Sequence, residues 1–207
     1  MSENDPTRRP LEMHGEMAAL GFWSAVVATV ALVFSGITAT TAMKIPSLVS
    51  GLLLVPAFVV LMACVHNYAP AERRTFSRLG MLFALGYAVL IGFNYYMQLT
   101  LVRQGLYQDA FDMSSPLSVM WVIEVLGYGF MGLATLSAAW IFRVGTLENA
   151  VRWLFVTNGV LGIGGMIGYA LGWSLSLLLG GLIVCDIIMP VSTILLAILF
   201  RRSQQRQ

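Results

Sequence analysis

Two acidic side chains stand inside long apolar runs of this sequence, where they are the groups best able to bind or exchange charge. Glu124 lies in the run 117–142 and Asp186 in the run 175–200, and neither run contains lysine or arginine. A charged carboxylate at the centre of a membrane helix costs about 2.5–3.5 kcal/mol on insertion scales. These residues therefore predict either a site for a proton, cation or polar ligand, or hydrogen bonds that hold helices together.

Three neutral polar residues extend this candidate site. Asn94 and Gln98 are four residues apart and share one helix face, and Tyr128 follows Glu124 by the same spacing. At about 1.5 Å per residue, all of them and Asp186 lie roughly 6–16 Å from the same side of a bilayer. Lipid offers no hydrogen-bond partner, so we expect the five side chains to turn inward and form a ligand-binding pocket in the outer half of the membrane.

A proline adds a backbone acceptor beside one of the acids. Pro190 follows Asp186 by four residues. Proline lacks an N–H and displaces the carbonyl four residues before it, which here belongs to Asp186. The sequence thus predicts a carboxyl group and a freed carbonyl at one helix bend.

The composition identifies the kind of elements that position these residues. Of 207 residues, 58% are hydrophobic and 11% are charged, and the mean hydropathy is +0.80. Soluble domains average about 45–50% apolar and about 25% charged residues. This excludes a soluble globular domain, a disordered chain and a disulfide scaffold, while a net charge of +2 is too small to indicate nucleic-acid binding.

Hydrophobic runs of about 20 residues are long enough to cross a bilayer as helices. They predict an all-α, polytopic membrane bundle within a single transmembrane domain, 18–200, between a short tail, 1–17, and a basic tail, 201–207. A tight turn is expected near residues 173–176, because the 48 residues from 153 to 200 exceed one span. The six predicted helices are 18–42, 46–66, 79–102, 117–142, 153–173 and 175–200.

The basic residues predict the orientation of this bundle. With the N-terminus inside, ten of the 12 lysines and arginines fall on the inner side and only Lys44 and Arg103 on the outer side. This asymmetry favours cytoplasmic positions for both termini.

Sequence motifs for catalysis or cofactor binding are absent. There is no phosphate-binding glycine loop, His-Glu-x-x-His, Cys-x-x-Cys or Gly-x-Ser-x-Gly. The only histidines, His14 and His66, predict no haem or zinc site, and Cys64 and Cys185 are expected to be reduced packing residues. We therefore predict no cofactor, no metal and no catalytic residue, and consider an enzyme the less favoured class.

The fifth run is rich in glycine, and three of its glycines recur every four residues. Gly164, Gly168 and Gly172 form a face of small residues that lets another helix approach closely. Packing inside the bundle is favoured over association with a second protein, because six helices offer many internal neighbours.

Two segments resemble uncharacterised bacterial six-helix membrane proteins. They are Asn-Tyr-Tyr-Met-Gln-Leu-Thr-Leu-Val-Arg-Gln at 94–104 and Glu-Val-Leu-Gly-Tyr at 124–128. The resemblance covers about the third to fifth predicted helices and implies a location in the bacterial plasma membrane, that is, the inner membrane, without implying an activity.

Together these features predict a small multipass membrane protein whose polar pocket binds or transports a small molecule, a cation or a proton. The alternatives are a structural or regulatory membrane subunit, in which the polar groups only pair helices, and an integral membrane enzyme acting on a lipid-like substrate.

Overall fold

The computed structural model describes residues 15–40, 44–111, 115, 117–143, 145–173 and 175–205. Within these residues the chain is helical and contains no strand, which confirms the predicted all-α class. All six α-helices are long and apolar enough to cross a membrane, as the sequence predicted. The elements are α1 (Gly15–Thr40), α2 (Lys44–Tyr68), η2 (Ala71–Arg73), α3 (Arg74–Met97), η3 (Gln98–Val102), α4 (Val119–Ala139), α5 (Thr146–Ala170) and α6 (Leu175–Gln204).

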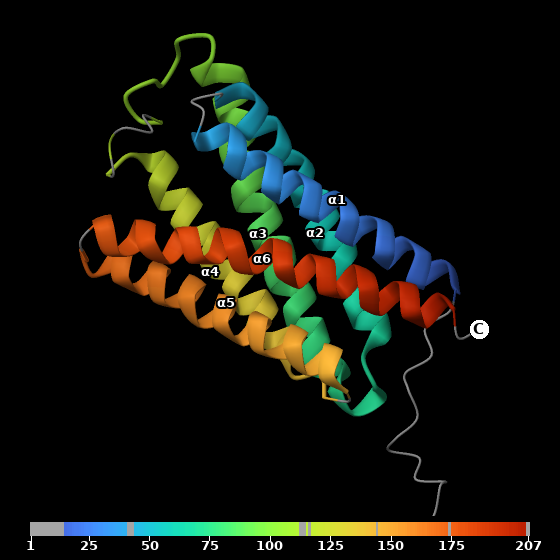
Figure 1. The fold of residues 1–207 in the computed structure, drawn as a ribbon. Helices are drawn as coiled ribbons and strands as arrows, with labels where there is room; N and C mark the ends of the chain where they lie inside the picture. Colours follow the sequence, from blue (N-terminus) through green and yellow to red (C-terminus); the bar gives the residue numbers. More distant parts are fainter. Residues whose placement is uncertain are drawn as a thin grey trace, which may run out of the picture.

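The helices form a closed ring in chain order (Figure 1). Each helix packs against the next one in the sequence, and α6 packs against α1. The beginning of α1, the end of α6 and the α2–α3 and α4–α5 connections share one end of the bundle, which we call the arginine-rich end. The described arginines at this end are Arg73, Arg74, Arg78, Arg143, Arg152, Arg201 and Arg202.

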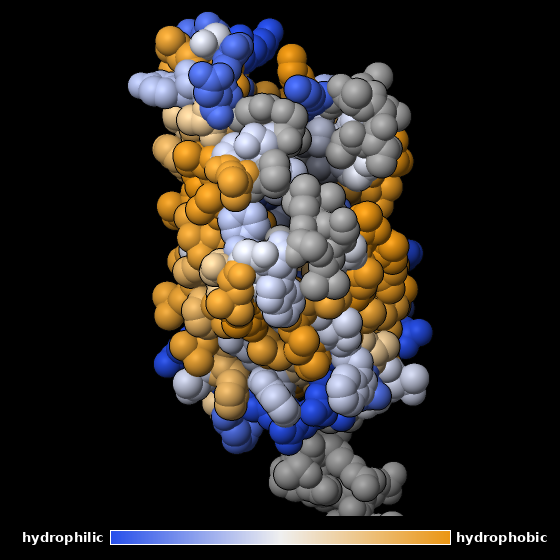
Figure 2. Space-filling model, turned by 90° about the vertical axis from the view of Figure 1, so that its left-hand side faces the viewer, coloured by the Kyte–Doolittle hydropathy of each residue, from blue (hydrophilic) through white to orange (hydrophobic). Residues whose placement is uncertain are grey.

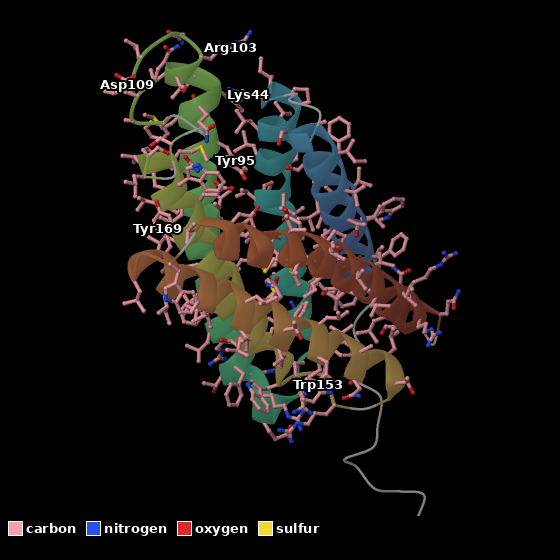
Figure 3. All side chains as sticks on the ribbon, turned by 60° about the vertical axis from the view of Figure 1, so that its left-hand side comes forward. Lys44, Tyr95, Arg103, Asp109, Trp153 and Tyr169 are labelled. Atoms are coloured by element: carbon pink, nitrogen blue, oxygen red, sulfur yellow. The ribbon has the colours of Figure 1, made fainter. Side chains whose placement is uncertain are left out.

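The opposite end, which we call the loop end, carries the other connections. Figure 3 shows Lys44, Arg103 and Asp109 at this end and Trp153 at the other. This arrangement is what six successive crossings produce. The cytoplasmic position of the arginine-rich end stays a prediction.

Helix α6 is longer than the hydrocarbon core of a bilayer is thick. Its 30 residues span about 45 Å, against a hydrocarbon thickness of about 30 Å. In Figure 1, α5 and α6 are inclined to α3, and α1 and α6 lie together near the C-terminus but separate toward the loop end.

An aromatic cluster fills the arginine-rich half. The ring of Tyr68 lies 6.0 Å from that of Phe142 and 6.3 Å from that of Phe200, and the rings of Phe142 and Phe155 are 5.8 Å apart. All four side chains are buried. They tie α2, α5, α6 and the α4–α5 connection together and leave little space along the bundle axis here.

The predicted tight turn between the last two helices is confirmed. Gly172 has a φ of 73°, its N–H donates to the carbonyl of Tyr169 (3.1 Å), and the N–H of Trp173 donates to the carbonyl of Gly168 (2.9 Å). This is a Schellman motif with glycine in the left-handed position. It ends α5 and lets α6 begin after a very short connection.

The glycines that bring helices together differ from the predicted set. A Cβ at Gly168 would meet the ring of Trp173 from the Schellman turn, and one at Gly164 would meet no described atom within 4 Å. A Cβ at Gly162 would instead lie 2.8 Å from the carbonyl oxygen of Tyr128, and one at Gly159 would lie 2.9 Å from that of Gly132. The close contact of α5 with α4 thus uses a different glycine face.

Candidate functional site

The carboxyl group of Glu124 is the centre of a buried polar cluster in α3 and α4. Its side chain is only 8% exposed. The Tyr95 hydroxyl donates to Oε1 at 2.6 Å, and the Asn94 amide donates to Oε2 at 2.7 Å. Both carboxyl oxygens are therefore held by neutral donors from the neighbouring helix.

The amide of Asn94 organises the next part of the cluster. Asn94 is fully buried, and its Nδ2 also donates to the carbonyl of Met120 at 3.3 Å. Its Oδ1 accepts a hydrogen bond from Gln98 Nε2 at 3.4 Å. The structure thus brings together three of the five predicted residues, Asn94, Gln98 and Glu124, in one hydrogen-bonded chain.

A wide helical turn follows this chain directly. Residues Gln98–Val102 form a π-helix, in which the N–H of Arg103 donates to the carbonyl of Gln98 at 3.2 Å. Such turns are rare and occur frequently at functional sites. Here the π-helix lies between the polar cluster and the loop end.

Tyr95 is a site residue that the sequence reasoning missed. Figure 3 shows it in the half of the bundle nearer Lys44 and Arg103. A signal for it exists in α2, because a Cβ at Gly51 would collide with the Tyr95 ring. Gly51 therefore provides the space from which Tyr95 reaches Glu124, but only the folded structure pairs these two positions.

Tyrosine rings continue the site away from the carboxyl group. Tyr128, a predicted site residue, lies near Tyr95 and has its ring 6.5 Å from that of the buried Tyr87. Tyr87 in turn packs on Phe58 of α2 at 5.3 Å. The site is thus bounded on this side by an aromatic wall with hydroxyl groups.

Asp186 stands apart from the hydrogen-bonded chain. Its side chain is exposed, and it lies near enough to Glu124, Tyr87 and Tyr128 to interact with them electrostatically. The buried Pro190 follows within α6, so the carbonyl of Asp186 lacks its usual helical donor. Asp186 therefore offers two acceptors, its carboxyl group and its backbone carbonyl, near the Glu124 cluster.

Neither acid is neutralised by a neighbouring cation. Across the residues that the structure describes, no ion pair is found for Glu124 or Asp186, and their surroundings contain tyrosines and amides. Figure 2 shows that the coloured surface along the side of the bundle is mostly apolar, with strongly hydrophilic residues toward its two ends, while the Glu124 cluster is buried. The site is thus a polar interruption in an otherwise apolar bundle.

A second buried polar contact, between α4 and α5, is uncharged and provides a comparison. Asn158 Nδ2 donates to Thr135 Oγ1 at 3.1 Å, and both side chains are buried. This contact pairs two helices without an ionisable group. The Glu124 cluster differs from it in having an acid with a second acid nearby.

Comparison with known proteins adds no further constraint. No protein-family model, curated protein or solved structure matches the chain. The function must therefore be argued from the geometry of the site.

Proposed function

We propose that this chain is a small multipass membrane protein that binds a proton or a small cation at Glu124, with Asp186 as a second acidic group. One observation carries the proposal: Glu124 is buried among neutral donors, with a second acid near it and no basic partner within the described structure. A buried carboxylate without a counter-charge is costly in an apolar environment. Uptake of a proton or cation removes that cost.

The surrounding residues have distinct roles in this proposal. Tyr95 and Asn94 fix the orientation of the Glu124 carboxyl group, and Gln98 holds Asn94 in place. Asp186 lies near enough to Glu124 to interact with it electrostatically and supplies the second acidic group of the site.

The aromatic cluster favours binding over conduction in this conformation. Transport requires a polar route to both ends of the bundle. The arginine-rich half is instead filled by the rings of Tyr68, Phe142, Phe155 and Phe200. Transport would require that half to open.

A structural role is the second candidate, and the same hydrogen bonds favour it. Both oxygens of Glu124 are already occupied by protein donors, so the cluster also joins α3 to α4. Membrane hydrogen bonds of this kind contribute about 0.6 kcal/mol on average. In this alternative the acid takes up nothing.

Infrared difference spectroscopy of the protein in lipid nanodiscs separates the two candidates. The pH is stepped with and without added sodium or potassium, and the absorption of protonated carboxyl groups is recorded. Glu124→Gln should remove one component that responds to pH or to the cation. Glu148→Gln, which removes a carboxyl group at the arginine-rich end, is the matched control and should keep it. If Glu124→Gln leaves every response unchanged, the structural role stands and the binding function is wrong.

A further inference from the structure

A groove runs along the outside of the bundle between α1 and α6, away from the Glu124 cluster. Its volume is about 240 Å³, and its walls include Val26 and Val30 of α1 and Ile194 and Ile198 of α6. Val30 is 62% exposed, so the groove is open to the surroundings of the bundle. In a membrane, these surroundings are lipid acyl chains.

A hydrogen bond between the two helices sets the floor of this groove. The hydroxyl groups of Thr29 and Thr193 are 2.7 Å apart, and Thr29 is one of the lining residues. Because this contact joins α1 to α6 directly, it holds the two walls at a fixed separation. The fixed separation of α1 and α6 therefore defines the groove, in addition to the positions of the lining side chains.

One end of the groove is positively charged. Arg201 lines it in the last turn of α6, and Arg202 follows. The distance along the helix from Ile194 to Arg201 is about 10 Å, which fits within one leaflet of a bilayer whose core is about 30 Å thick. No acidic partner of Arg201 is found among the described residues.

We propose that this groove binds one acyl chain of an anionic phospholipid, with the lipid phosphate on Arg201. The apolar walls match the chain, and the guanidinium matches the phosphate, with which arginine makes paired hydrogen bonds. Basic pockets between membrane helices bind anionic headgroups in the same way. The site lies at the arginine-rich end and does not depend on the function proposed for Glu124.

Native mass spectrometry of the full chain tests the site. Detergent-purified protein is incubated with equal amounts of phosphatidylglycerol and phosphatidylcholine, and the retained lipid is counted. The wild type should retain phosphatidylglycerol preferentially. Arg201→Gln should lower that preference by about fivefold, the effect of one basic residue near an anionic surface, and Arg201→Lys should keep most of it. Arg202→Gln, next to the groove but outside its lining, should change it less than Arg201→Gln.

A second pair of variants tests the acyl-chain part of the site. Val30→Trp fills the groove and should reduce retention of phosphatidylglycerol, whereas Val27→Trp, on the same helix but outside the lining, should not. Both positions are exposed, so both variants should fold. Equal retention by the two tryptophan variants, or an unchanged preference in Arg201→Gln, would overturn the proposal. Displacement of the lipid by glycerol phosphate at equal concentration would also overturn it, because the acyl chain would then contribute nothing.

Discussion

Replacing Glu124 distinguishes the charge of this side chain from its hydrogen bonds. In Glu124→Gln, the new Oε1 can still accept from Asn94, and the new Nε2 can donate to the Tyr95 hydroxyl. Glutamine thereby keeps both contacts of the native carboxyl group, which are 2.7 Å to Asn94 and 2.6 Å to Tyr95. Glu124→Leu has a similar size but keeps neither contact.

The expected effects on stability follow from these contacts. Two lost membrane hydrogen bonds predict that Glu124→Leu lowers the free energy of unfolding by about 1.2 kcal/mol, at about 0.6 kcal/mol each. Asn94 limits the loss, because its amide still donates to the carbonyl of Met120. Glu124→Gln should change the free energy of unfolding by less than about 0.6 kcal/mol.

Unfolding in mixed micelles with increasing sodium dodecyl sulfate measures these differences. Asn158→Leu provides the control, since it removes one uncharged contact to Thr135 and should cost about 0.6 kcal/mol. The order of stability should be wild type, Glu124→Gln, Asn158→Leu and Glu124→Leu. If Glu124→Gln is less stable than Glu124→Leu, the hydrogen bonds at this position do not stabilise the fold, and the reasoning from them is wrong.

Three further predictions concern the fold. Gly162→Leu should lower thermal stability strongly, because a Cβ there already lies 2.8 Å from the Tyr128 carbonyl oxygen, whereas Gly164→Leu should be tolerated; equal melting temperatures in detergent would contradict this. Gly172→Ala should cost about 1 kcal/mol of unfolding free energy, because the φ of 73° is unfavourable for alanine, and a neutral effect in the same micelle titration would rule out the described turn. Single cysteines at Gln108 and Ser203 should react with an impermeant maleimide from opposite sides of the membrane; labelling of both from one side would refute six crossings.

Hydropathy predicted the helices well because it reports the part of each helix that lies in hydrocarbon. The predicted run 153–173 corresponds to α5, yet α5 begins at Thr146, and α6 continues from the predicted end at 200 to Gln204. These extra turns carry charged residues that lie beyond the apolar core. Backbone hydrogen bonding does not stop where hydropathy falls, so the apolar pattern underestimates helices that project from the membrane.

The cluster was predictable to the extent that it depends on helix periodicity. The i,i+4 spacing of Asn94 and Gln98 placed them on one face, and equal depth placed Glu124 beside them. Tyr95 was not predictable from periodicity, because its ring lies against Gly51 of α2 and depends on the space that this glycine leaves. Pairings across helices depend on rotation and close approach, which one sequence does not reveal.

The glycine-rich helix shows the same limit. A four-residue repeat predicted a packing face at Gly164, Gly168 and Gly172, yet Gly168 and Gly172 belong to the turn that ends α5. A glycine that permits a left-handed residue and a glycine that permits close packing look identical in a sequence. The folded structure distinguishes the two roles, because Gly172 has a φ of 73° in the turn that ends α5.

The two ends of α6 behave differently, and Pro190 lies between them. On the arginine-rich side, Thr193 bonds to Thr29 of α1, which fixes that part of α6 to the ring. On the other side of the proline, Asp186 is exposed. Proline removes one hydrogen bond of the helix between these two parts. Pro190 therefore separates the part of α6 that carries Asp186 from the part that is bonded to α1.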